Sequence, residues 1–264
     1  MSGVIAIVHP ATNEDQQVRA EQVWLARDMT QIAANLATVR ARISVACHNA
    51  GRAPESVALL PVSKTRPASD VLAAHAAGYR RFGENKAQEA EAKAAELAQL
   101  ADLEWVMIGH LQSNKAKLVA RFASEFQALD SLALAAELDR RLQAEGRQLD
   151  VLIQVNSSAE DSKFGLPPEQ VPAFAAALTS FDALRVRGLM TLALPSPIED
   201  QVRACFVRMQ QVQAQLRDQG IEGQSYDELS MGMSGDFELA IQHGATVVRV
   251  GTAIFGQRSY PAVG

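Results

Sequence analysis

The sequence contains little cysteine, and its charge is not strongly of one sign. Only Cys47 and Cys205 occur among 264 residues, far apart and without a nearby cluster of histidines. We therefore expect neither a disulfide scaffold nor a zinc site, and the cysteine usage fits a reducing cytoplasm. Acidic residues outnumber basic ones by 30 to 25. The overall charge thus gives no indication of nucleic acid as a partner.

Long apolar runs are also missing. No run approaches the roughly 20 apolar residues that span a bilayer. The short run at residues 4–8 lacks the basic segment that opens a signal peptide. We therefore expect a cytoplasmic protein without a membrane partner. The hydrophobic fraction of 48% is nevertheless ample for a core.

Short apolar runs alternate along the chain with longer segments of helical spacing. Strands that alternate with helices predict a parallel sheet. Eight runs favour a closed (β/α)8 TIM barrel, which would use nearly all of the chain, over an open doubly wound sheet. The runs are residues 57–62, 79–82, 104–108, 126–129, 151–155, 184–189, 226–229 and 246–250.

An N-terminal helix is predicted before the first strand. Apolar residues at helical spacing occupy residues 29–50, and Gly51 follows them. Residues 1–27 mix polar residues with one short apolar run, so we predict an irregular tail there. No linker or low-complexity tract divides residues 28–264, which we interpret as a single barrel domain.

The residues that follow the strands are the candidates for a site, because barrel enzymes carry their sites at the C-terminal ends of the strands. Lys64 follows the first run. Partial desolvation at a barrel mouth disfavours the ammonium form and leaves an amine able to form a Schiff base. The alternative is a lysine that extends to solvent from a strand end.

The last two strands are followed by residues suited to an anion. Residues 230–235 supply hydroxyls and glycines, and Gly251 and Thr252 stand at the predicted start of a last helix. Backbone N–H groups in such loops bind phosphate, although glycine and serine are also common in ordinary turns. Arg249 ends an apolar strand and should face either a ligand or a carboxylate. His110, after the third strand, is a weaker candidate.

Five segments, taken in order, closely resemble the pyridoxal 5′-phosphate (PLP) homeostasis protein family, also called the proline-synthase co-transcribed group. They are residues 61–65, 82–85, 108–115, 229–234 and 249–256. The resemblance implies a barrel similar to the N-terminal barrel of alanine racemase, with PLP carried on a lysine. It also implies a role in the balance of vitamin B6, without established catalysis. The implied partners are apo-enzymes and free amino acids, and the implied oligomeric state is a monomer.

The resemblance also assigns roles to residues of this chain. Lys64 becomes the Schiff-base lysine, and Arg249 becomes the partner of the pyridine nitrogen. The implied phosphate ligands are Ser230, Ser234, Gly251 and Thr252. The implied further neighbours of the cofactor are Asn85 and Met231. The chain departs from the family pattern at Arg66, Lys86, Ala87 and Val106.

Two other functions remain open at this point. One is a PLP-dependent racemase or lyase of low activity on amino acids. An arginine beside the pyridine nitrogen argues against it, because a permanent cation favours an unprotonated ring and a weaker electron sink. The other is a barrel enzyme without PLP that acts on a phosphorylated sugar, with Lys64 as its general base.

Overall fold

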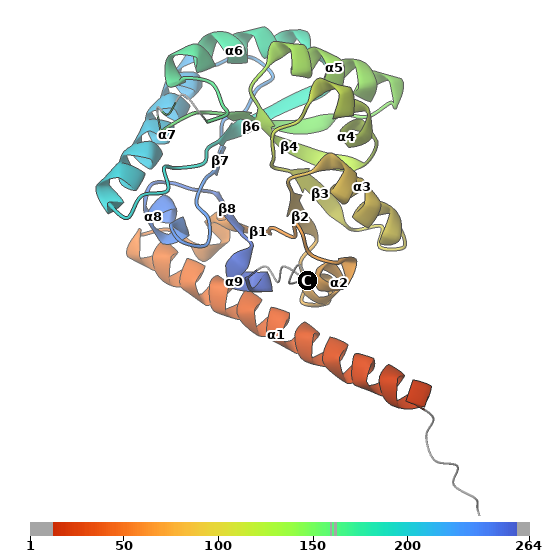
Figure 1. Cartoon of the computed structure of the whole chain (residues 1–264). Helices are drawn as coiled ribbons and strands as arrows, with labels where there is room; N and C mark the ends of the chain where they lie inside the picture. The colour runs from red at the N-terminus through yellow and green to blue at the C-terminus, as the bar shows by residue number, and fades with distance from the viewer. Residues whose placement is uncertain (1–12, 159, 161–162, 258–264) are drawn as a thin grey trace, which may run out of the picture.

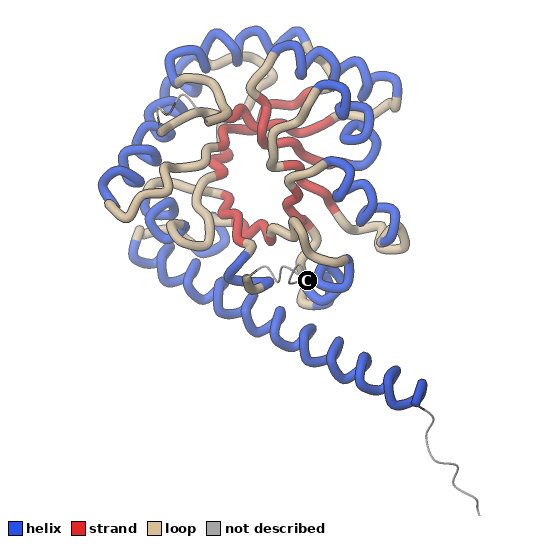
Figure 2. The backbone as a smooth tube through the Cα atoms, viewed as in Figure 1, coloured by secondary structure: helices blue, strands red, loops and turns tan. Residues whose placement is uncertain are grey.

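Eight parallel strands form a central ring with helices packed around it, as the computed structural model shows (Figures 1 and 2). The structure describes residues 13–158, 160 and 163–257. The strands are β1 (Ala58–Pro61), β2 (Arg81–Glu84), β3 (Glu104–Met107), β4 (Ala123–Leu129), β5 (Leu149–Gln154), β6 (Leu184–Met190), β7 (Glu228–Ser230) and β8 (Val247–Val250). The helices are α1 (Asn13–Asn49), α2 (Ala68–Ala76), α3 (Ala87–Glu96), α4 (Ala116–Phe122), α5 (Leu132–Ala144), α6 (Val171–Ala177), α7 (Glu199–Gln219), α8 (Phe237–Gln242) and α9 (Thr252–Phe255).

The sheet closes on itself. The first strand pairs with the last, with Ala58 opposite Val247, and the remaining strands follow in the order β8 to β2. Between β1 and β2 the ring is completed by a parallel bridge from Val62 to Gly83. The N–H of Ser63 donates to the carbonyl of Gly83 at 3.0 Å. The predicted TIM barrel is therefore confirmed, and each of the eight predicted runs contributes a strand.

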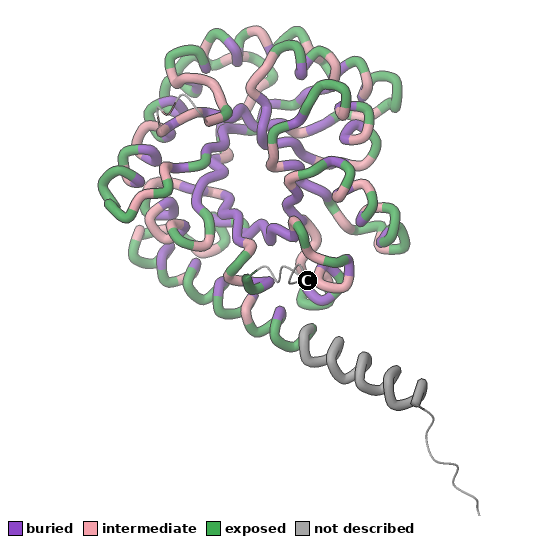
Figure 3. The backbone as a smooth tube through the Cα atoms, in the orientation of Figure 1, coloured by how far each residue is buried: buried purple, intermediate pink, exposed green. Residues whose placement is uncertain are grey.

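The strands are apolar on both faces because both faces are covered. Their outward side chains pack under the helices, and their inward side chains fill the barrel, so the ring is buried almost throughout (Figure 3). The carboxyl ends of all eight strands meet at one mouth. Among the described residues no helix is long and apolar enough to cross a membrane.

Helix α1 is longer than predicted. It begins at Asn13, so the prediction of irregular structure for residues 1–27 is wrong for residues 13–27, and residues 1–12 lie outside the described residues. Periodic apolar residues indicated only the part that packs on the barrel, where Leu36 and Ile43 are buried. Residues 13–27 are rich in Glu, Gln, Arg and Ala, which favour helix intrinsically. Figure 1 shows this part of α1 extending beyond the barrel.

The end of the barrel opposite the mouth carries partly buried carboxylates. Glu125 forms an ion pair with Arg81 and accepts a hydrogen bond from the Gln127 amide at 2.6 Å. Glu228 lies near it, and burial together with the negative charge of Glu125 raises the pKa of Glu228. Its Oε2 atom is buried without a hydrogen-bond partner among the described residues. The charged form of Glu228 is therefore unfavourable in the folded protein.

We expect Glu228→Gln to raise the free energy of unfolding at pH 8 by about 1 kcal/mol after screening by solvent. Because the folded state raises the pKa of Glu228, the folded chain binds protons more readily than the unfolded chain. The loss of stability caused by the charged Glu228 is therefore absent near pH 4 and grows as the pH rises through the pKa of Glu228 in the folded state. Urea denaturation at pH 4 and pH 8 measures the difference. Glu104→Gln, whose side chain is 53% exposed, is the control, and a gain that is equal at both pH values would contradict the prediction.

Candidate cofactor site

A cavity of about 310 Å³ opens at the mouth of the barrel. It is lined by Val62, Lys64, Asn85, Ile108, Leu192, Met233, Ser234, Gly235, Arg249, Gly251 and Thr252. Strands β1 and β8 are neighbours, so the first and the last quarter of the chain meet there. The cavity thus gathers six of the eight residues predicted to bind a cofactor, namely Lys64, Asn85, Ser234, Arg249, Gly251 and Thr252.

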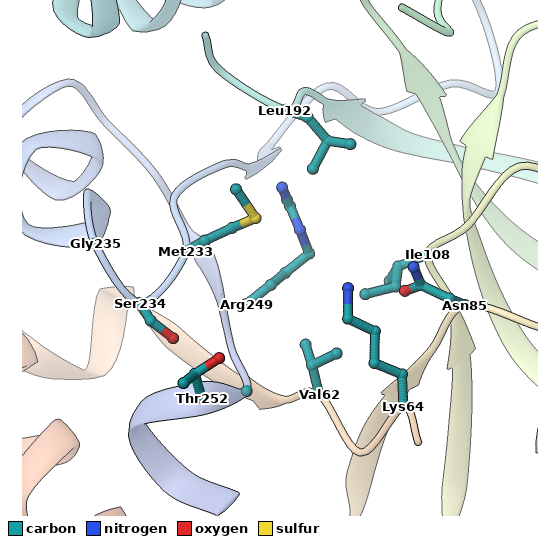
Figure 4. A pocket seen from close by; sticks show the side chains of 11 residues that line it. Val62, Lys64, Asn85, Ile108, Leu192, Met233, Ser234, Gly235, Arg249 and Thr252 are labelled. Atoms are coloured by element: carbon teal, nitrogen blue, oxygen red, sulfur yellow. The ribbon is translucent and has the colours of Figure 1, made fainter. Parts of the chain in front are cut away.

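Lys64 lies in the turn directly after β1. Its side chain is drawn extending into the cavity between Arg249 and Asn85 (Figure 4). Ser63, the residue before it, is fully buried. This placement favours a lysine that faces a ligand over one that extends to bulk solvent.

Two hydroxyl groups approach each other on the opposite side of the cavity. Figure 4 shows Ser234, in the loop after β7, beside Thr252 at the start of α9. The N–H of Ala253 donates to Ser234 Oγ at 3.5 Å, which ties the two loops together. The first N–H groups of a helix have no partner within it and are available to an anion.

Close backbone packing shapes both loops. Gly232 has a φ of +94°, and a Cβ there would lie 2.7 Å from the Cβ of Ala240. A Cβ on Gly251 would lie 3.1 Å from the carbonyl oxygen of Val62. Glycine at these positions therefore lets the loop after β7 lie close to α8 and the loop after β8 lie close to the end of β1.

Arg249 is buried at the floor of the cavity. Its Nη1 donates to Ser230 Oγ at 2.7 Å, and its Nη2 donates to the carbonyl of Thr191 at 2.7 Å. Burial lowers the pKa of Arg249 to about 10, against the opposing charge of Asp236, so the side chain stays charged at neutral pH. No carboxylate of the described residues forms an ion pair with it. This favours the prediction that Arg249 faces a ligand.

Ser230 and Met231 do not line the cavity. Both are fully buried, and Ser230 Oγ donates to Gln127 Oε1 at 2.7 Å while it accepts from Arg249. Gln127 in turn donates to Glu125. Gln127 was not among the predicted site residues, although a polar residue inside the apolar run at residues 126–129 was a usable signal. Ser230 therefore supports Arg249, and its predicted contact with phosphate stays untested.

The weaker candidates lie elsewhere. The ring of His110 stacks on that of Phe164, with 4.1 Å between centroids, and does not line the cavity. Val106, one of the departures from the family pattern, is fully buried. Among the described residues no group of three or more His, Cys, Asp or Glu side chains could hold a metal ion.

Known proteins resemble the chain over most of its length. The family model "alanine racemase, N-terminal domain" matches residues 28–259. The pyridoxal phosphate homeostasis protein of Pseudomonas aeruginosa is 47% identical over 234 residues, which cover 89% of this chain and 99% of that protein. The pyridoxal phosphate homeostasis protein of Escherichia coli strain K12 is 45% identical, with 88% and 99% covered.

Solved structures agree with these matches. PipY of Synechococcus elongatus, solved with PLP bound, has a TM-score of 0.76 and 39% identity, with 86% of this chain and 100% of PipY covered. Alanine racemase of Streptomyces coelicolor shares the fold, with a TM-score of 0.67, 19% identity and 58% of its own chain covered. The chain belongs to the alanine racemase N-terminal domain family, and within it to the pyridoxal phosphate homeostasis proteins.

Proposed function

We propose that this chain binds PLP in the cavity at the barrel mouth and acts in PLP homeostasis. The observation that carries the proposal is the meeting of the Lys64 amine, the Arg249 guanidinium and the hydroxyls of Ser234 and Thr252 around one cavity. An amine on one side of the cavity can react with an aldehyde, and hydroxyls at the start of a helix on the other side can bind a phosphate. A single small molecule that carries both groups therefore suits the cavity. PLP bound to the related PipY supports this choice.

Each residue has a distinct task in this proposal. Ser234 and Thr252 bind the phosphate together with the backbone N–H groups of their loops, and Arg249 donates a hydrogen bond to the ring nitrogen. Lys64 holds the molecule covalently, and Asn85 stands beside it. When bound, PLP supplies an aldehyde that condenses with an amine, with release of one water, and a ring that withdraws electrons.

A carrier fits this cavity better than a racemase or lyase of low activity. Arginine can only donate a hydrogen bond, so Arg249 favours a pyridine nitrogen that keeps its lone pair. A racemase also needs a second base, and neither Tyr79 nor Tyr226 lines the cavity. Tyr260 lies outside the described residues. We further propose that the chain acts as a cytoplasmic monomer, with apo-enzymes and free amino acids as partners.

Borohydride reduction followed by peptide mass spectrometry tests the proposal. After incubation of the purified chain with PLP and reduction, we expect a cofactor adduct on the peptide that contains Lys64. An adduct mainly on Lys86 or Lys115 would contradict the assignment of the lysine. The absence of any adduct and of any visible absorption would favour a barrel enzyme that acts on a phosphorylated sugar without PLP.

Removal of residues 1–28 should leave the affinity for PLP within twofold of that of the full chain. The cavity residues that the structure describes all lie at or after Val62, and the part of α1 that packs against α2, α8 and α9 remains. Titration of both chains with PLP provides the measurement. A tenfold loss, about 1.4 kcal/mol, would show that the segment contributes to the site and that the proposed division at residue 28 is wrong.

A further inference from the structure

A cluster of charged side chains from β2 and α3 holds the turn that carries Lys64. The turn runs from Ser63 to Arg66, whose N–H donates to the carbonyl of Ser63 at 3.0 Å. The cluster consists of Glu84, Glu89 and Lys93. None of the three lines the cavity, and the proposed binding of PLP does not use them directly.

Lys93 holds the peptide group before Lys64. Its side chain is only 7% exposed. Its amine donates to the carbonyl of Ser63 at 2.7 Å, to Glu84 Oε1 at 2.6 Å and to Glu89 Oε1 at 2.8 Å. An ammonium has three hydrogens, so these acceptors use its full capacity. The ammonium is therefore fixed in position, and it fixes the Ser63 carbonyl with it.

Glu89 holds the peptide group after Lys64. Its Oε1 atom accepts a hydrogen bond from the backbone N–H of Thr65. Thr65 has a φ of +62° and is the one residue other than glycine with a positive φ among the described residues. A β-branched residue rarely adopts this conformation, because its side chain crowds the neighbouring backbone there. The turn is therefore strained, and the carboxylate of Glu89 stabilises the strained form.

Glu84 connects the turn to the neighbouring strand. It is fully buried, and its Oε1 accepts from Ser63 Oγ at 2.6 Å as well as from Lys93. The next residue, Asn85, lines the cavity. Burial raises the pKa of Glu84, and the contacts with Lys93 and Ser63 oppose that rise. One ionic cluster thus links two sides of the cavity.

We infer that Glu84, Glu89 and Lys93 are positioning residues that place the Lys64 amine for covalent attachment of PLP, an inference that rests on the proposed function. Buried ion pairs contribute little net stability, because desolvation offsets their attraction. They do fix geometry, and both peptide groups beside Lys64 are held by this one cluster. A misplacement of about 1 Å costs an oriented reaction on the order of 100-fold.

The variant Glu89→Ala tests the inference. The Glu89 side chain is 24% exposed and lies on α3, where alanine favours helix, so the variant should fold. In the cofactor-free chain we expect the Thr65 amide to exchange with deuterium at least tenfold faster than in the parent. We expect the rate constant for covalent attachment to Lys64 to fall at least tenfold. The affinity for pyridoxine 5′-phosphate, which has the phosphate and ring but no aldehyde, should stay within twofold.

Two further variants serve as controls. Glu89→Gln keeps an acceptor oxygen for the Thr65 N–H and should recover most of the covalent attachment. Glu96→Ala removes an exposed carboxylate from the end of the same helix and should match the parent in every measurement.

The outcomes separate this inference from the proposed function. If Glu89→Ala attaches PLP covalently as well as the parent does, the inference is overturned. It is also overturned if the affinity for pyridoxine 5′-phosphate and the covalent attachment fall equally, because an equal loss indicates general damage to the cavity. If the parent chain itself gives no adduct on Lys64, the proposed function fails and the inference fails with it.

Discussion

Replacement of Lys64 by alanine should abolish the covalent attachment of PLP while the barrel stays folded. The side chain extends into the cavity, so its removal opens no hole in the packed core. The Lys93 and Glu89 contacts use the backbone of the turn and should survive the substitution. Borohydride reduction with mass spectrometry should find no adduct at position 64, and circular dichroism should show parental thermal unfolding.

Lys115→Ala is the matched control for that experiment. Lys115 also follows a strand, at the end of the 3-10 helix Ser113–Lys115 after β3, yet it does not line the cavity. It should keep full covalent attachment. If Lys64→Ala retains a stoichiometric adduct at another lysine, the assignment of Lys64 is wrong, whatever its place in the cavity.

Arg249→Glu should destabilise the cofactor-free chain by at least about 3 kcal/mol, because a buried charge without a partner is among the most costly substitutions. The guanidinium donates to the Thr191 carbonyl, and a carboxylate there would face that oxygen instead. Ser230 offers no relief, since its hydrogen is directed to Gln127. Urea denaturation at neutral pH measures the loss.

The pH dependence of this loss identifies its cause. Burial would raise the pKa of the introduced carboxyl in the folded state above its unfolded value of about 4.3. The folded variant would then bind a proton more readily, so its deficit should shrink as the pH falls towards 4. Arg249→Met, which brings no charge, should lose only about 1–2 kcal/mol at either pH. Equal losses in the two variants would show that the introduced carboxylate adds no cost of its own, and would contradict the prediction.

The strands were predictable from the sequence because a parallel barrel buries both faces of each strand. Runs such as residues 57–62 are apolar without interruption, and helical segments separate them, which is typical of this architecture. The length of α1 was not predictable in this way. Its core-facing stripe begins near Ile32, and the residues before it are helical through intrinsic propensity, which apolar spacing does not register.

The cavity was predictable only in part. Lys64, Arg249 and Thr252 could be found because they lie within an apolar run or within two residues of its end. The supporting residues could not, because their partners come from distant positions. In the sequence, Lys93 is indistinguishable from the other charged residues of an amphipathic helix. Only the packing of α3 beside β2 and the turn after β1 shows that its amine lies in the interior.

The pairing of β1 with β8 has a consequence for synthesis of the protein. Lys64 leaves the ribosome well before Val247 and the loops around Thr252, which lie about 180 residues further along the chain. At about 5–20 residues per second, the lysine waits on the order of 10 s or longer for the strand that closes the ring beside it. Under the proposed function, a nascent chain therefore carries Lys64 before its phosphate-binding loops exist, so firm binding of the cofactor has to wait for ring closure.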